Sequence, residues 1–186
     1  IQAVLNAVPD IAEPALPHAQ PLQHIGRVEL RNVEFRYPGA EESVLHEVSF
    51  TLEPGTTTAI VGGTGSGKST LVNLLPRLLD VSEGEILIDG VDVRDIPLEE
   101  LWSLFGLVPQ RGFLFGGTVA TNVRFSRPDA TDEEIWDALT VAQAREFVDQ
   151  LPEGLEAAID QGGVNLSGGQ RQRLAIARCL VREPLI

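Results

Sequence analysis

Residues 62–70 read Gly62-Gly63-Thr64-Gly65-Ser66-Gly67-Lys68-Ser69-Thr70. They fit the pattern G-x-x-x-x-G-K-[ST] and lie between a short apolar run (56–62) and a run with helical spacing (68–75). Glycines let the backbone turn successive N–H groups toward a phosphate, and the helix that follows adds partial positive charge at the same point. The stretch therefore predicts a buried strand, a phosphate-binding loop and a helix, with a nucleoside triphosphate as ligand.

Two side chains of this loop have predicted roles of their own. Lys68 is expected to reach the β- and γ-phosphates, and the Ser69 hydroxyl is expected to join the shell of Mg²⁺. Lys68 is also the only lysine in the chain, which indicates that this position needs a compact ammonium rather than a planar guanidinium. The loop alone does not distinguish a kinase, a GTPase and an ATPase.

Composition limits the remaining possibilities. The chain has 186 residues, of which 43% are hydrophobic and 22% charged, enough to bury the core of one domain, or of one domain with an embedded subdomain. Lys and Arg number 14 against 27 Asp and Glu, so the net charge of −13 argues against nucleic acid as a partner. No apolar run is long enough to span a bilayer. The single cysteine excludes a disulfide framework.

The periodicity of the sequence changes along the chain. Residues 1–24 predict the end of a helix followed by a proline-rich linker, so we expect a domain over 25–186. Alternating apolar residues predict a strand near 28–35, bulged near Asn32, and further strands over 48–54 and 84–90. A helix is expected over 98–105, a buried strand over 106–110, helical segments over about 111–165 and an amphipathic helix over 167–181, with a new strand starting at 185–186.

A second motif decides the class of protein. Leu166 precedes Ser167-Gly168-Gly169-Gln170, which opens the amphipathic helix with Ser167 as its N-cap. With this motif about 100 residues after the glycine-rich loop, the chain resembles the ATP-binding cassette (ABC) family, whose signature is LSGGQ. The resemblance covers nearly all of the chain from about residue 25.

The resemblance implies a fold and a mode of pairing. The fold is α/β: a RecA-like P-loop NTPase core with an N-terminal antiparallel β subdomain and an inserted helical subdomain, incomplete at the C-terminus. In this family two nucleotide-binding domains pair head to tail, so that the signature residues 167–170 of one domain close over the ATP held by the loop 62–70 of the other.

The resemblance also assigns three further positions. Tyr37 lies where the family places an aromatic ring that stacks on adenine, and the alternative is an amphipathic residue at a strand end. Gln110 matches a catalytic glutamine that contacts Mg²⁺ and the attacking water. The segment Phe113-Leu114-Phe115 either belongs to the core or meets the coupling helices of a transmembrane domain.

Three features favour an exporter. They are the helical tail with its proline-rich linker, the segment around Gln110, and Asp160-Gln161-Gly162-Gly163, which stands where exporters carry G-E-x-G. Gln161 at the glutamate position resembles one half of heterodimeric bacterial exporters, whose two ATP sites are unequal. We therefore expect the chain after Ile186 to continue as a strand ending in Asp, followed by a second Asp instead of the catalytic Glu.

The resulting hypothesis is the ATPase domain of an exporter at the cytoplasmic face of the cell membrane, attached through a transmembrane domain outside this sequence. It would use ATP and Mg²⁺, and the 186-residue piece alone would be inactive. Two alternatives remain: a soluble ABC ATPase acting on DNA or ribosomes, and an importer ATPase subunit. The charge and the linker count against the first, and an apolar span just upstream would exclude both.

Overall fold

The computed structural model describes residues 11–15 and 22–186, which fall into two compact units. The first reaches Phe105 and includes Leu185; the second runs from Gly106 to Pro184 and includes Ile186. The predicted helical tail over 1–8 and much of the predicted linker lie outside the described residues. The proposed domain start at residue 25 stays a prediction.

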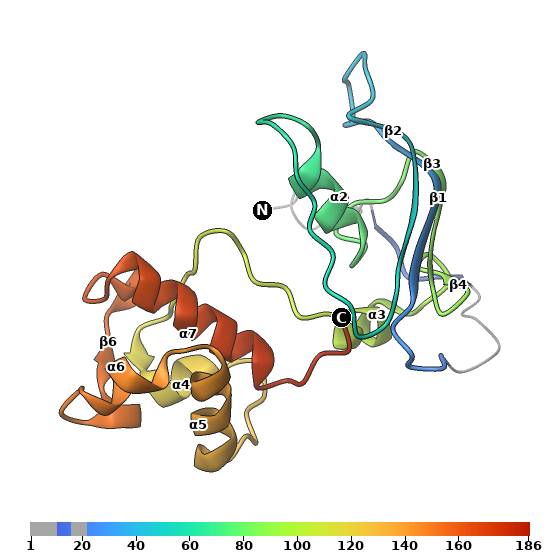
Figure 1. Ribbon diagram of the computed structural model, residues 1–186. Helices are drawn as coiled ribbons and strands as arrows, with labels where there is room; N and C mark the ends of the chain where they lie inside the picture. Colours follow the sequence, from blue (N-terminus) through green and yellow to red (C-terminus); the bar gives the residue numbers. More distant parts are fainter. Residues whose placement is uncertain (1–10, 16–21) are drawn as a thin grey trace, which may run out of the picture. The chain divides into compact units, whose positions relative to one another are not determined.

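A four-stranded antiparallel sheet forms the frame of the first unit (Figure 1). Its order is β2-β1-β3-β4, with β1 at Val28–Phe35, β2 at Leu45–Leu52, β3 at Glu83–Ile88 and β4 at Val91–Asp92. The predicted alternation holds in β1, because Val28, Leu30, Val33 and Phe35 are at most 4% exposed. The antiparallel β subdomain expected from the sequence is confirmed.

The predicted bulge in β1 is present at Asn32. The register between β1 and β2 shifts between Leu30 and Val33, and Asn32 has a φ of 47°. The Asn32 N–H donates to Ser49 Oγ at 2.8 Å, which replaces a regular ladder bond. On the other side of β1, Gly84 has a φ of +80°, and a Cβ there would lie 2.3 Å from the Asn32 carbonyl oxygen. Only glycine fits opposite this bulge.

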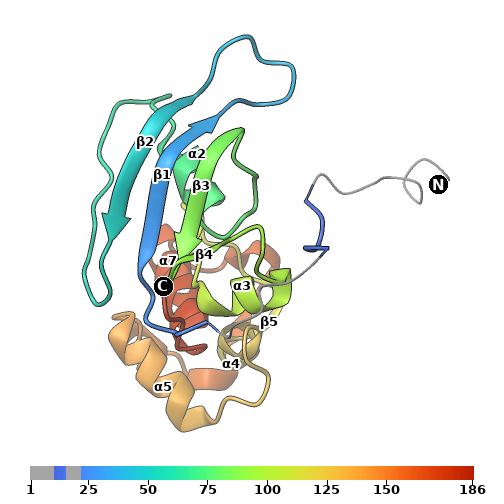
Figure 2. The ribbon, with the colours of Figure 1, turned by 90° about the vertical axis from the view of Figure 1, so that its right-hand side faces the viewer.

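Two short helices complete the first unit. Helix α2 (Lys68–Leu74) follows the glycine-rich loop and lies over one face of the sheet, behind β1 and β3 in Figure 2. Helix α3 (Leu98–Leu104) matches the helix predicted over 98–105, and its Trp102 indole N–H donates to the Pro76 carbonyl oxygen at 2.9 Å. Both helices that the sequence predicts within residues 22–105 therefore form.

Two predicted strands do not form. Residues 56–62 and 106–110 have no strand assignment, and every residue from 53 to 66 is exposed. Residues 185–186, where a further strand was expected to start, have no strand assignment either, and the continuation of that strand stays a prediction. A strand inside a parallel sheet needs a hydrogen-bonding neighbour on each side. The sheets of the described residues contain antiparallel pairs alone, and none of them involves these three segments. Apolar composition predicted the strands, but a partner decides whether a strand exists.

The second unit is mainly helical (Figure 1). It contains α4 (Val119–Arg124), α5 (Asp132–Val141), α6 (Arg145–Asp149), α7 (Gly168–Leu180), the 3₁₀ turns η1 (Gly154–Glu156) and η2 (Gln161–Gly163), and a two-stranded sheet of β5 (Gly117–Thr118) and β6 (Ala158–Ile159). Its core gathers fully buried aliphatic side chains from α4, α5 and α7, among them Val123, Leu139 and Leu174. Leu114 also lies in this core, at 0% exposure.

Asn122 and Arg178 hold an irregular segment of this unit in place. The Asn122 side chain is 1% exposed, accepts from the Phe115 N–H at 2.9 Å and donates to the carbonyl oxygens of Phe115 and Thr118. The Arg178 guanidinium donates to Asn122 Oδ1, to the Asn122 carbonyl oxygen and to the Phe113 carbonyl oxygen. Its partial burial lowers the pKa of Arg178 from the ordinary value. Among the groups that these bonds satisfy are backbone atoms of Phe113 and Phe115, which lie outside the helices and strands.

We predict that Asn122→Ala destabilises the second unit by about 2–3 kcal/mol, because buried N–H and C=O groups lose their partners. Urea unfolding followed by the fluorescence of Trp136, which packs against this core, measures the change. Asp137→Asn is the control, since Asp137 is exposed on α5 and should shift stability by less than about 0.5 kcal/mol. Equal stabilities of Asn122→Ala and the control would contradict the proposed anchoring.

Candidate functional site

The glycine-rich loop ends where α2 begins. Gly67 is the N-cap of α2 with a φ of 82°, and a Cβ at this position would lie 2.7 Å from Leu45 Cδ2. Any larger residue would therefore meet both an unfavourable backbone conformation and a side chain of β2. By contrast, a Cβ at Gly63 or Gly65 would have no heavy atom within 4 Å, so this side of the loop is open. A ligand could therefore approach the backbone of the loop closely at Gly63 and Gly65.

Lys68 is bound by its own loop. Its Nζ donates to the carbonyl oxygens of Gly62 (2.8 Å) and Gly63 (2.7 Å) and to Ser66 Oγ (3.2 Å). All three acceptors are uncharged. No ion pair of Lys68 occurs within residues 11–15 and 22–186. The site therefore keeps an uncompensated positive charge beside an open loop, which suits a phosphate.

Tyr37 lies beside the same loop. A cavity of about 310 Å³ is lined by Tyr37, Val44 and residues 65–70. The Tyr37 hydroxyl and Thr70 Oγ1 are 3.0 Å apart and share a hydrogen bond, and the tyrosine ring packs edge-on against Phe35 at 4.8 Å. Tyr37 is 43% exposed, so part of the residue remains accessible to a ligand. Tyr37, Lys68, Ser69 and Thr70 thus come together in one cavity, although they are up to 33 residues apart.

The LSGGQ segment forms the start of α7. Ser167 is the N-cap, with its Oγ accepting from the Gln170 N–H at 3.2 Å, and Gln170 Oε1 accepts from the Ser167 N–H at 2.8 Å. This reciprocal capping box fixes the first turn. Gly168 and Gly169 carry no side chain that would cover the remaining N–H groups of the helix terminus. The predicted N-cap is confirmed, and the exposed turn can approach an anion.

Gln110 lies in the second unit, in a loop rather than at the end of the predicted strand. Its side chain lines a cavity of about 490 Å³ whose wall includes Gly168 of the signature, together with Gln110, Arg111, Gly112, Gly162, Val164, Arg171 and Gln172. Within this unit the structure brings the Gln110 loop beside the signature, a neighbourhood that sequence analysis did not predict.

Gln161 lies at the start of η2, and its Oε1 accepts from the Gly116 N–H at 3.0 Å. The position where exporters carry glutamate therefore contacts the segment that follows Gln110. A glutamate carboxylate could accept the same hydrogen bond, so the contact is compatible with either residue.

Sequence reasoning missed Arg171 and Gln172, which follow the signature on α7. Their side chains hydrogen-bond to backbone atoms of two different loops. The available signal was the run Gln170-Arg171-Gln172-Arg173 at the start of an amphipathic helix, where long polar side chains can reach neighbouring loops.

Comparisons with known proteins show the family of this chain. The family model described as "ABC transporter" matches residues 45–186. The chain belongs to the ABC transporter family. The α/β fold class that the sequence predicted is confirmed with it.

Relatives and a solved structure extend this match. An uncharacterised ABC transporter ATP-binding protein of Mycobacterium bovis is 57% identical over 87% of this chain and 28% of its own length. An ATP-dependent lipid A-core flippase of Pseudomonas aeruginosa is 49% identical over 87% of the chain and 27% of its own length. The structure of a bacterial Atm1-family ABC exporter with ATP bound superposes with a TM-score of 0.90 at 37% identity, covering 98% of this chain and 32% of that one. This ABC chain thus spans about a quarter to a third of the proteins that it resembles.

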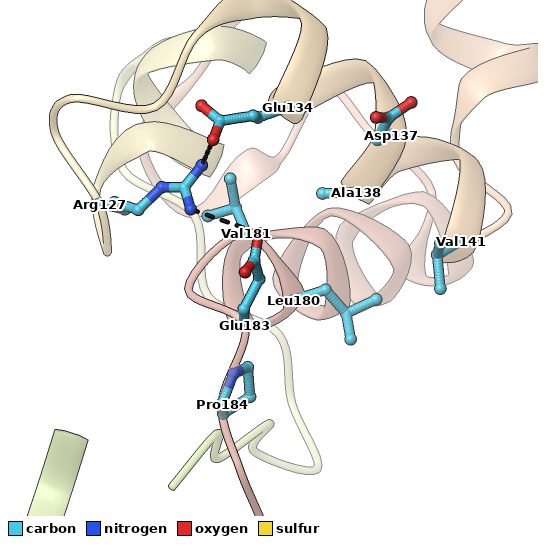
Figure 3. A pocket seen from close by; sticks show the side chains of 9 residues that line it. All are labelled: Arg127, Glu134, Asp137, Ala138, Val141, Leu180, Val181, Glu183 and Pro184. Atoms are coloured by element: carbon cyan, nitrogen blue, oxygen red, sulfur yellow. Dashed lines mark ion pairs between the residues drawn. The ribbon is translucent and has the colours of Figure 1, made fainter. Parts of the chain in front are cut away.

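A further cavity of this ABC chain, about 370 Å³ in volume, lies in the second unit between α5 and the end of α7 (Figure 3). Arg127 forms ion pairs there with Glu134 and Glu183, and Asp137 adds a third carboxylate. Three acidic groups against one guanidinium disfavour a phosphate anion. None of the residues predicted from the sequence as site residues lines this cavity, so it does not compete with the glycine-rich loop as the nucleotide site.

We predict that Ser167→Ala lowers the stability of the second unit by about 1 kcal/mol, because α7 loses its N-cap. Ser167→Asp restores the cap and hence most of this stability, since a carboxylate accepts the same N–H bond and suits a helix N-terminus. Urea unfolding of the two variants beside the wild-type chain provides the measurement. Equal loss in both variants would show that the Ser167 hydroxyl does not act as the cap.

Proposed function

We propose that this chain is the ATP-binding and ATP-hydrolysing domain of a membrane ABC exporter, and that ATP-driven head-to-tail pairing with a second such domain powers export. The observation that carries the proposal is the presence, in one chain, of an open loop with an uncompensated Lys68 and of a capped α7 terminus at Ser167. Export is supported by relatives named for it, including a putative multidrug export ATP-binding/permease protein of Bacillus subtilis that is 47% identical to this chain.

In this proposal the loop 62–70 holds the triphosphate of ATP. Lys68 exchanges its present acceptors, the carbonyl oxygens of Gly62 and Gly63, for phosphate oxygens, which are charged and therefore stronger partners. Tyr37 offers its exposed ring to the adenine. Ser69, and Gln110 from the second unit, supply oxygen ligands for Mg²⁺, which would neutralise charge on the phosphates.

The signature residues 167–170 serve the second ATP of the dimer. Because Gln170 is held in the capping box with Ser167, the first turn of α7 is fixed before ATP arrives. Gly168 and Gly169 let a phosphate approach the helix terminus closely. Preorganised donors of this kind need little rearrangement when they bind a developing charge. The residues suit a surface that closes over a nucleotide held by a partner.

The aromatic patch of Phe113, Phe115 and Phe125 is proposed to meet the coupling helices of the transmembrane domain. These side chains are 51%, 37% and 62% exposed, whereas neighbouring Leu114 is fully buried. The rings of Phe115 and Phe125 stack at 4.5 Å, and the Arg178 guanidinium lies 5.3 Å from the Phe115 centroid. A cluster of exposed aromatic side chains supported by a fixed cation is typical of a docking surface.

The two ATP sites of the dimer are proposed to be unequal, and the partner to be a different chain. Gln161 in place of the exporter glutamate supports this proposal. The proposed location is the cytoplasmic face of the cell membrane, where the domain would be anchored through its transmembrane domain. In the part of the chain that the structure describes, no helix has the length and apolar character needed to cross a bilayer.

We predict that Lys68→Ala in the intact transporter removes most binding or turnover of ATP, and that Lys68→Arg fails as well. A guanidinium cannot fill a position built for a compact ammonium between two carbonyl oxygens. ATPase rates of the purified transporter with its partner provide the test. If the loop 62–70 of this chain forms the less active of the two unequal ATP sites, Lys68→Ala lowers turnover only partly. Ser167→Ala then lowers turnover more, because the signature of this chain serves the more active site. Near-normal turnover of Lys68→Arg would refute this account of the lysine.

We predict that the isolated 186-residue chain does not turn over ATP, because hydrolysis needs a signature from a second domain and a general base that none of its predicted site residues supplies. The measurement is phosphate release by the monodisperse chain, with Lys68→Ala as the control for contaminating ATPases. Steady release that Lys68→Ala abolishes would overturn this expectation.

A further inference from the structure

Two consecutive residues of α7 hold two different loops. Arg171 Nη1 donates to the carbonyl oxygens of Gly163 (3.1 Å) and Leu166 (2.5 Å), so it binds the signature loop, which we define as residues 163–167. The Arg171 stem also fills the space beside Gly163, where a Cβ would lie 2.9 Å from Arg171 Cδ. The position of Ser167 therefore depends on the first turns of α7.

Gln172 holds the Gln110 loop, which we define as residues 109–112. Its Oε1 accepts from the Gly112 N–H at 3.1 Å, and its Nε2 donates to the Pro109 carbonyl oxygen at 3.2 Å. Both bonds go to the backbone, on either side of Gln110. The amide of Gln172 supplies a donor and an acceptor together, which neither a carboxylate nor an ammonium can do.

The Gln110 loop also packs directly on the helix. A Cβ at Gly112 would lie 3.0 Å from the Arg171 carbonyl oxygen and 3.2 Å from Ala175 Cβ. The loop backbone thus touches the backbone of α7 over one turn, and the two bonds of Gln172 fix its register there. A displacement of this loop would displace the start of α7 with it, because tightly packed groups transmit strain.

We propose that Gln172 is a positioning residue that makes the Gln110 loop and the signature loop move as one body. The inference rests on the proposed function, in which Gln110 acts at the ATP of its own domain and the signature acts at the ATP held by the partner. Gln172 then links the two ATP sites of the dimer. The first turns of α7 hold the loop of Gln110, which acts at one site, and are capped by Ser167, which acts at the other.

The intact transporter with its partner provides the test, with MgATP as the probe. Gln172→Met keeps the length of the side chain and removes both bonds, whereas Gln172→Glu keeps the acceptor for the Gly112 N–H. We expect Gln172→Met to lower kcat by about tenfold or more, since a small misplacement of a catalytic group is costly. Gln172→Glu should fall between Gln172→Met and the wild type. Binding of a fluorescent ATP analogue should change by less than about twofold in both variants, because the loop 62–70 is untouched.

Arg173→Met is the matched control. Arg173 is the next residue of α7, but it donates to the Gln143 carbonyl oxygen and lies over Phe147, away from both loops. It should retain kcat within about twofold. Hydrogen exchange adds a structural measurement: a non-hydrolysable ATP analogue should protect residues 109–112 and 163–167 together in the wild type, and this joint protection should be lost in Gln172→Met.

Two results would overturn the role of Gln172. The first is wild-type turnover in Gln172→Met. The second is a parallel loss of analogue binding and turnover, because that pattern indicates general damage to the domain. A different result would refute the proposed function itself: Lys68→Ala would bind the ATP analogue as tightly as the wild type does.

Discussion

The capping box between Ser167 and Gln170 is the interaction on which the second unit depends. An uncapped helix leaves four N–H groups without partners, and here the cap fixes the residue at which α7 begins. From that starting point, Arg171, Gln172 and Arg178 reach the neighbouring loops at defined positions along the helix. The same turn that is stabilised for folding is the turn that faces a nucleotide in the proposed dimer, so stability and function share one piece of structure.

Arginine and lysine make different kinds of contact in this chain, because their charged groups differ in shape. Arginines hold irregular backbone: Arg171 binds two carbonyl oxygens of the signature loop, Arg178 binds the segment after Gln110, and Arg124 donates to the Ala130 carbonyl oxygen at 2.9 Å. A planar guanidinium with five N–H groups can satisfy several such acceptors at once. The single lysine, Lys68, rests on uncharged acceptors that phosphate oxygens can replace. The structural cations and the proposed nucleotide-binding cation are thus different residue types.

Local patterns predicted those parts of the fold that are decided locally. The alternation of β1, its bulge at Asn32, helix α3 and the N-cap at Ser167 depend on residues a few positions apart, and all were predicted correctly. The strands at 56–62 and 106–110 were predicted wrongly, because a parallel strand depends on neighbours that periodicity does not reveal. The motifs identified the loop of Lys68. The contacts of Gln172 join residues 60 and 63 positions apart, so no local pattern could have predicted them.

The bulge of β1 makes the residue that is possible at position 84 depend on the backbone conformation at position 32. Asn32 leaves the regular ladder, and its carbonyl oxygen then occupies the space in which a side chain at position 84 would stand. A related chain that keeps the bulge must keep glycine at 84, whereas a chain with a regular β1 could carry a larger residue there. Substitutions at 32 and 84 should therefore appear as a pair across related sequences, although the two residues lie on different strands.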